Sequence, residues 1–238
     1  MIEYIHLFPV ADMASAFWQS TLPGKMIVLI LFVGSAAAWT IMWTKGQQLR
    51  NASAATQRFL KTFRDTSNPL DISARQGPFT HTPLEVIYQE GCRAVELECQ
   101  GEGGGDSSVA RLNMHQLETI RAVVDRTLAD EVLLLEDQMG LLATAVSAAP
   151  FLGLLGTVWG VMDAFSGMAM AGNAALSAVA PGISGALLTT IIGLIVALPS
   201  MIGYNLLSAE IRRISVQMDN FAQEFVSGVQ KTYVVEAE

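Results

Sequence analysis

Three long apolar stretches dominate the pattern of hydrophobic and polar positions along the chain. The first covers residues 26–44 and is flanked by lysines, and a second tract covers 138–209, in which Asp163 is the only charged residue. A helix that crosses a hydrocarbon core of about 30 Å needs roughly 20 apolar residues. Because the small and polar segment SGMAMAGNAALS divides the second tract in two, the pattern predicts three transmembrane helices.

Helical periodicity continues outside these spans. From Val109 onward, apolar residues recur at steps of three and four with no helix breaker before Pro150, which predicts one unbroken helix that runs into the second span. The same spacing follows the third span as far as Val229, so the third helix should also extend beyond the lipid. Another helix is expected to begin at Thr82, where Glu85 completes a capping box.

The basic residues predict how the chain is oriented. Ten of the 14 Lys and Arg lie from Lys45 to Arg126 and three follow the third span, and basic loops stay in the cytoplasm. We therefore expect a multi-pass membrane protein with its N-terminus outside and its C-terminus in the cytoplasm. The expected segments are an outer amphipathic segment at 1–22, a first span at 23–45, a cytoplasmic helical region at 46–138, a second span at 139–166, an outer loop at 167–177, a third span at 178–205 and a cytoplasmic C-terminal helix at 206–238.

Composition excludes several classes of function. The chain is 51% hydrophobic and 15% charged, and its mean hydropathy of +0.40 argues against an ordinary soluble domain. A net charge of -8 without a basic patch argues against nucleic-acid binding. No nucleophile–base pair, phosphate loop or metal-ligand spacing occurs, so we expect no enzyme activity, cofactor or metal site. Cys92 and Cys99 are expected to be reduced packing thiols.

Small and hydroxyl residues form one face on each of the last two spans. In the second span this face consists of Gly153, Thr157, Gly160 and Ala164, and in the third of Gly182, Ala186, Thr190, Gly193, Ala197 and Ser200. Small faces let helix backbones approach closely, which is the main source of packing energy between helices in lipid. We therefore expect close packing at these glycines and alanines.

The polar and proline residues of these spans allow more than one interpretation. Thr157 and Thr190 either bond carbonyls of their own helices, or line a path that holds water or receives another protein's helix. Pro150 and Pro199 are expected to kink the helices, either to shape the bundle or to act in gating.

Two segments resemble the membrane signatures of a known family. GLLGTVWGVMDAF at 153–165 and VAPGISGALLTTIIGLIVALPSMIGYN at 179–205 are similar to those of the ExbB/TolQ branch of the MotA/TolQ/ExbB proton-channel proteins. The resemblance implies an all-α, multi-pass protein of the bacterial inner (cytoplasmic) membrane, with its N-terminus in the periplasm. Its second and third helices would form a homo-oligomeric ring, five-fold in this family. The ring would surround two copies of a single-span partner of the ExbD/TolR type, whose membrane aspartate carries the proton.

The same resemblance implies a function and a site. Proton motive force would drive rotation of the ring and its partner relative to each other, so the chain would be a stator subunit of a molecular motor. Thr157 and Thr190 would line the proton pathway. The work would be TonB-dependent uptake, envelope maintenance or motility, with a TonB-like, TolA-like or motility protein as a further partner. The alternative is a membrane scaffold that organises partners and conducts no ions.

Two positions depart from the family's pattern. Where the family usually reads PGIAEAL, this chain has Gly185 in place of the glutamate, and where it often has His or Asn, this chain has Asp163. One hypothesis is that Asp163 takes over part of the lost acid's role in proton access from the periplasm. The alternative is that Asp163 lies in the outer interface, where a carboxylate costs less than the roughly 2.5–3.5 kcal/mol of a helix centre.

Overall fold

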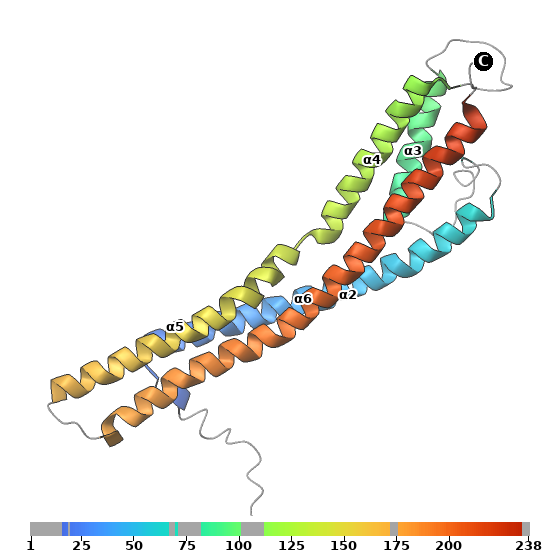
Figure 1. Cartoon of the computed structure of the whole chain (residues 1–238). Helices are drawn as coiled ribbons and strands as arrows, with labels where there is room; N and C mark the ends of the chain where they lie inside the picture. Colours follow the sequence, from blue (N-terminus) through green and yellow to red (C-terminus); the bar gives the residue numbers. More distant parts are fainter. Residues whose placement is uncertain are drawn as a thin grey trace, which may run out of the picture. The chain divides into compact units, whose positions relative to one another are not determined.

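The structure, a computed structural model, describes residues 16–18, 20–66, 70, 82–100, 112–171 and 176–234. Its helices are α2 (Leu22–Arg64), α3 (Pro83–Gln100), α4 (Met114–Glu136), α5 (Met139–Ala171) and α6 (Leu176–Tyr233) (Figure 1). The described residues contain no strand beyond an isolated bridge between Leu112 and Val234. The predicted all-α class is therefore confirmed for the described part of the chain.

Three helical stretches are long and apolar enough to cross a membrane, as the hydropathy pattern predicted. They are Leu22–Arg64, Met114–Met170 and Val179–Tyr233. Residues 1–15, which include most of the expected amphipathic segment, and residues 172–175 of the expected periplasmic loop lie outside the described part. Helix α5 continues to Ala171, inside the expected loop, because its last residues are mainly good helix formers.

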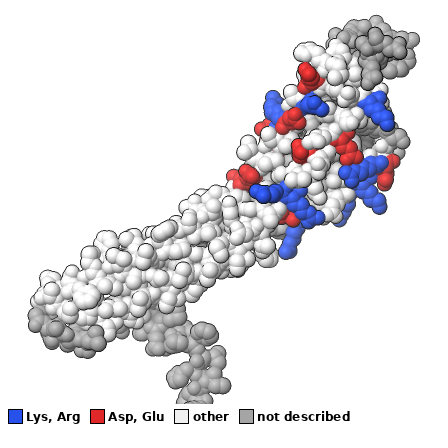
Figure 2. Space-filling view, viewed as in Figure 1, with Lys and Arg blue, Asp and Glu red and all other residues white. Residues whose placement is uncertain are grey.

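The chain divides into two compact units. The membrane unit comprises 1–44 and 138–206, and the charged unit comprises 45–137 and 207–238. On the face drawn in Figure 2, acidic and basic side chains gather over the charged unit, while uncharged side chains form the surface of the membrane unit.

The membrane unit is held together by residues from three helices. Its buried cluster combines Ile27 and Leu31 of α2, Ala149 of α5, and Val196 and Ala197 of α6. Large apolar side chains on the other faces of these helices are exposed. Examples are Phe32, Phe151, Leu187, Leu194, Leu198 and Ile202. A small-residue core under a bulky apolar surface is the pattern expected of a helix bundle in lipid.

Aromatic side chains form the core of the charged unit. The rings of Phe59, Phe63, Tyr88 and Phe221 contact one another edge to face, with centroids between 5.0 and 6.2 Å apart. Helix α3 begins at Pro83, and the amide of Glu85 donates to Thr82 Oγ1 at 3.2 Å, which confirms the predicted start of that helix.

The two thiols of α3 differ in their surroundings. Cys92 is buried, whereas Cys99 is partly exposed. Desolvation by burial raises the pKa of Cys92 to about 11, and burial also raises the pKa of Cys99 from its usual value. No disulfide joins them.

The prediction of one unbroken helix from Val109 into the second span is wrong. Helix α4 ends at Glu136 and α5 begins at Met139, and between them Gln138 has a φ of 66°. In a continuous helix, the carbonyls of residues 134 and 135 would accept bonds from the amides of residues 138 and 139.

A buried lysine takes these carbonyls instead. Lys45 is 4% exposed, and its Nζ donates to Leu134 O at 3.2 Å and to Leu135 O at 3.4 Å. A cation at a helix C-terminus is also favoured by the helix dipole. Lys45 of α2 therefore caps the C-terminal end of α4 at the point where the helix breaks.

Candidate functional site

Helices α5 and α6 of the membrane unit approach each other so closely that glycine is required at several positions. A Cβ on Gly193 would lie 2.6 Å from Ala149 O, and a Cβ on Gly153 would lie 2.9 Å from Thr189 O. Farther along the pair, a Cβ on Gly160 would lie 2.7 Å from Ala186 Cβ. Contacts with backbone atoms leave no room for a larger residue, so the glycines bring the two backbones together.

The predicted small-residue face of α6 contacts more than one helix. Gly182 faces Ala164 of α5, where an added Cβ would lie 3.1 Å from Ala164 Cβ. Ala197, in contrast, is part of the cluster that includes α2. Ser200 is buried, and its Oγ donates to Val196 O of its own helix at 2.7 Å.

Three threonine hydroxyls meet within the α5–α6 contact. Thr157 Oγ1 and Thr190 Oγ1 are hydrogen-bonded to each other, so the structure brings these two predicted site residues together. Thr190 Oγ1 also donates to Gly153 O across the helix pair at 3.1 Å. Thr157 Oγ1 donates to Gly153 O of its own helix at 3.1 Å and to Ala186 O of α6 at 3.3 Å. Thr157 therefore bonds a carbonyl of its own helix, as one interpretation expected, and also a carbonyl of α6. The other interpretation, in which Thr157 and Thr190 line a path for water or for another protein's helix, stays a prediction.

The third hydroxyl belongs to Thr189, which the sequence analysis missed. Thr189 is 1% exposed, and its Oγ1 donates to Gly153 O at 3.0 Å and to Ala186 O at 2.7 Å. Its Cβ and Oγ1 are also the atoms that an added Cβ on Gly156 would meet. The only sign of this contact in the sequence was that Gly156 is a further glycine between Gly153 and Gly160.

All three hydroxyls lie within hydrogen-bonding distance of Gly153 O. A carbonyl oxygen has two lone pairs, and the α-helix already uses this oxygen once. The three hydroxyls therefore cannot all donate to Gly153 O at the same time. Each has another partner: Thr157 and Thr190 have each other, and Thr189 has Ala186 O. Hydroxyl hydrogens rotate freely to suit their acceptors, so donors in this threonine cluster can exchange without movement of a helix.

Gly185 lies beside the N-terminal segment. A Cβ on Gly185 would lie 3.0 Å from Ala16 O and 3.1 Å from Ser20 Cα. Gly185 is buried, so the backbone of the N-terminal segment fills the space that a larger side chain would need. No local pattern predicts this contact, because it joins residues far apart in the chain.

Asp163 lies in α5 and is half-buried. The pairing of Gly160 with Ala186 and of Ala164 with Gly182 places Asp163 near the level of Ile183 along α6, about 3 Å along the axis from Gly185. The atoms nearest to the Cβ position of Gly185 nevertheless belong to Ala16 and Ser20.

Both predicted prolines lie inside helices that continue on either side of them. Pro150 is in α5, and Pro199 is in α6, which also contains Pro181. A proline lacks the amide hydrogen for the helix bond to the residue four positions earlier.

Comparison with known proteins identifies the family. Residues 81–220 match the MotA/TolQ/ExbB proton channel family. The chain is 30% identical over 219 residues to the Tol-Pal system protein TolQ of Pseudomonas aeruginosa, covering 90% of each chain. It is 31% identical over 215 residues to TolQ of Haemophilus influenzae, covering 89% of this chain and 90% of that one. It is also 31% identical over 199 residues to the biopolymer transport protein ExbB of Pseudomonas putida, covering 82% of this chain and 56% of the relative. With both membrane signatures inside the aligned region, the chain belongs to the ExbB/TolQ-like branch of the MotA/TolQ/ExbB proton channel family.

Proposed function

We propose that the chain is the ring-forming subunit of a proton-driven stator in the bacterial inner membrane. The observation that carries the proposal is the threonine cluster, in which Thr157, Thr189 and Thr190 compete for one carbonyl oxygen between α5 and α6. Its occurrence in a member of a proton channel family supports a role in handling a proton. The ring is a homo-oligomer, a pentamer, with its N-terminus in the periplasm and its C-terminus in the cytoplasm.

In this proposal, α5 and α6 surround a single-span partner of the ExbD/TolR type that bears a membrane aspartate. A carboxylate inside a membrane is costly unless it is hydrogen-bonded or protonated. Hydroxyls that can switch acceptors stabilise the charged aspartate by turning toward it and donating to it, and they return to Gly153 O and Ala186 O when the aspartate is neutral. Proton flow through this switch drives rotation for TonB-dependent uptake, envelope maintenance or motility. The similarity to proteins named TolQ and ExbB supports this range of work.

The first experiment is native mass spectrometry of the full chain, co-expressed with a single-span, aspartate-bearing protein of the ExbD/TolR type from the same genome. The expected result is a closed ring of five copies that retains two copies of the partner. A ring or a monomer that never retains the partner would contradict the stator proposal.

The second experiment measures proton flux in vesicles that contain the complex. Thr157→Val and Thr190→Val remove a hydroxyl with little change of shape, and each should lower the flux about tenfold, as expected for the loss of about 1.4 kcal/mol of hydrogen bonding. Thr157→Ser keeps the hydroxyl and should retain most of the flux. Thr40→Val is the matched control, because Thr40 is exposed and donates to Ala36 O of its own helix.

A specific observation favours a second candidate, a scaffold that conducts no protons. The glutamate usual in the family is absent at Gly185, and the backbone of Ala16 and Ser20 occupies its space. A scaffold would retain partners but show no flux in the wild type. Asp163→Asn tests the remaining acid: unchanged flux and unchanged pH dependence would show that Asp163 takes no part in proton access.

A further inference from the structure

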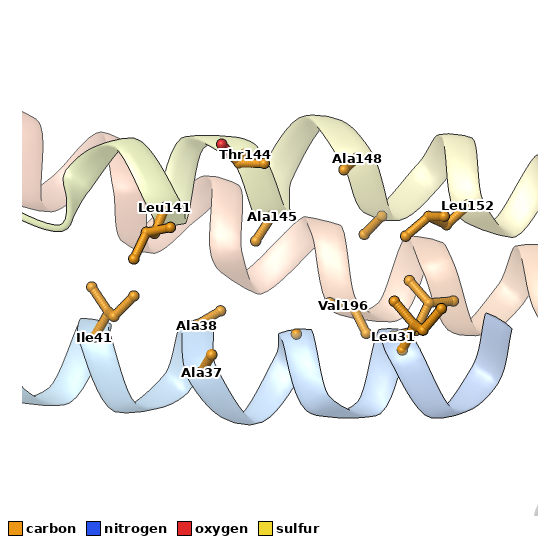
Figure 3. Close-up of a pocket in the computed structure, with 13 residues that line it drawn as sticks. Leu31, Ala37, Ala38, Ile41, Leu141, Thr144, Ala145, Ala148, Leu152 and Val196 are labelled. Atoms are coloured by element: carbon orange, nitrogen blue, oxygen red, sulfur yellow. The ribbon is translucent and has the colours of Figure 1, made fainter. Parts of the chain in front are cut away.

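A narrow apolar slot lies between α2 and α5 in the membrane unit (Figure 3). Its volume is about 260 Å³. The walls come from α2 and α5, and Val196 of α6 forms part of the floor. The slot is separate from the threonine cluster, which lies between α5 and α6.

Bulky side chains close both ends of the slot, and small residues line its middle. Ile41 and Leu141 face each other at one end, and Leu31 and Leu152 lie at the other (Figure 3). The residues between them are mostly glycine and alanine: Gly34, Ala37, Ala38, Ala145, Ala148 and Ala149. The small side chains therefore leave an elongated space with defined ends.

The length of the slot matches the depth of one leaflet. Leu31 and Ile41 are ten residues apart in α2, which corresponds to about 15 Å along the helix, half of a hydrocarbon core of about 30 Å. The slot lies mainly in the half of the first span that is nearer to Lys45 in the sequence. With the orientation proposed above, this is the cytoplasmic leaflet.

The chemistry of the slot excludes water. Thr144 contributes the single side-chain hydroxyl of the lining, and that hydroxyl donates to Gly140 O of its own helix at 2.8 Å. A cavity without free polar partners does not hold water but does bind apolar molecules. If the slot were empty, the side chains of both walls would lack dispersion contacts on the side that faces it.

We propose that this slot binds one acyl chain of a bilayer phospholipid. A slot of about 260 Å³ is too small for a helix about 10 Å in diameter along a length of about 15 Å. A single alkyl chain has the required shape and polarity, and the membrane supplies it around every spanning helix. The bound chain restores packing contacts between α2 and α5 that the small residues leave unmade.

Photolabelling in vesicles tests this proposal with internal controls. The wild-type chain is reconstituted in phosphatidylcholine vesicles in which a fraction of the lipid carries a diazirine at mid-chain, and labelled residues are found by mass spectrometry. Ala145 and Ala148 line the slot from α5 and are partly buried, so a chain inside the slot contacts them. Phe32 and Trp39, at 71% and 60% exposed, report on the surrounding lipid. We expect label on both pairs.

Ala37→Leu is the variant that fills the slot, because Ala37 lines it and is otherwise exposed. It should reduce label on Ala145 and Ala148 several-fold and leave label on Phe32 and Trp39 unchanged. Ala36→Leu, at an exposed neighbouring position that does not line the slot, is the matched control and should behave like the wild type.

Three results would overturn the proposal. The first is absence of label on Ala145 and Ala148 in the wild type. The second is equal labelling of these residues in Ala37→Leu. The third is a cross-link between a cysteine placed at Ala37 and a second copy of the chain in place of lipid label, which would make the occupant a neighbouring subunit.

Discussion

At the scale of single residues, the α5–α6 contact depends on the absence of side-chain atoms. Gly153 and Gly193 each face backbone atoms of the opposite helix, and backbone cannot move aside as a flexible side chain can. An added methyl group would therefore separate the helices or strain them. Separation would also lengthen the hydrogen bonds that Thr189 and Thr190 make to Gly153 O.

Gly153→Ala should lower the free energy of unfolding by about 1–3 kcal/mol through overpacking. Gly167, in the same helix, has no atom within 4 Å of its Cβ position, so Gly167→Ala should be neutral or stabilise by up to about 1 kcal/mol through helix propensity. Unfolding in detergent, followed by circular dichroism, measures both variants. Equal effects would mean that the close contact at Gly153 is absent.

Residue-level chemistry was only partly predictable from the sequence. Helical spacing placed Thr157 and Thr190 on the small faces, because spacing within one helix is a local property. Thr189 lies about 100° around the helix from Thr190, and its role depends on how α5 and α6 are aligned. The contact of Gly185 with Ala16 and Ser20 depends in the same way on tertiary structure.

At the scale of elements, the break between α4 and α5 is the feature that periodicity could not predict. Apolar spacing continues through residues 135, 139 and 142 as if one helix were present. The break accompanies the bonds of Lys45 to Leu134 O and Leu135 O, and Lys45 lies about 90 residues earlier in the chain. The existence of the helices could be predicted from local sequence. The boundary between α4 and α5 could not, because it accompanies a contact with a residue of another helix.

Gln138→Gly should stabilise the folded chain by up to about 1 kcal/mol. Gln138 has a φ of 66°, a conformation that costs a side-chain-bearing residue about 1–2 kcal/mol, and the greater freedom of glycine in the unfolded chain offsets part of that gain. Gln138→Ala keeps the Cβ and should bring no gain. Chemical unfolding of both variants provides the measurement, and destabilisation by glycine would indicate a continuous helix at this position.

At the scale of the whole molecule, exposed apolar residues are not confined to the membrane unit. In the charged unit Leu97, Leu133, Leu134 and Val216 are each more than half exposed. Apolar side chains exposed outside lipid often mark interfaces between proteins. The proposed ring supplies such an interface between neighbouring copies.

Val216→Glu should shift the assembly toward monomers, because a carboxylate at an apolar interface loses its hydration. Val216 is 54% exposed in the single chain, so the helix content of the chain should not change. Asn220→Glu, one turn farther along α6 at an exposed position, introduces the same charge and should leave the assembly intact. Light scattering coupled to size-exclusion chromatography distinguishes the two, and an intact ring in both variants would exclude Val216 from the interface.

The unequal thiols of α3 give the native chain a built-in attachment point for a fluorescent probe. The raised pKa of about 11 and the burial of Cys92 leave almost no thiolate at neutral pH. Cys99 is the more accessible of the two cysteines in the chain. A maleimide dye therefore selects Cys99 without removal of any cysteine, and a dye fixed there reports on the movement of α3 in an otherwise unmodified chain.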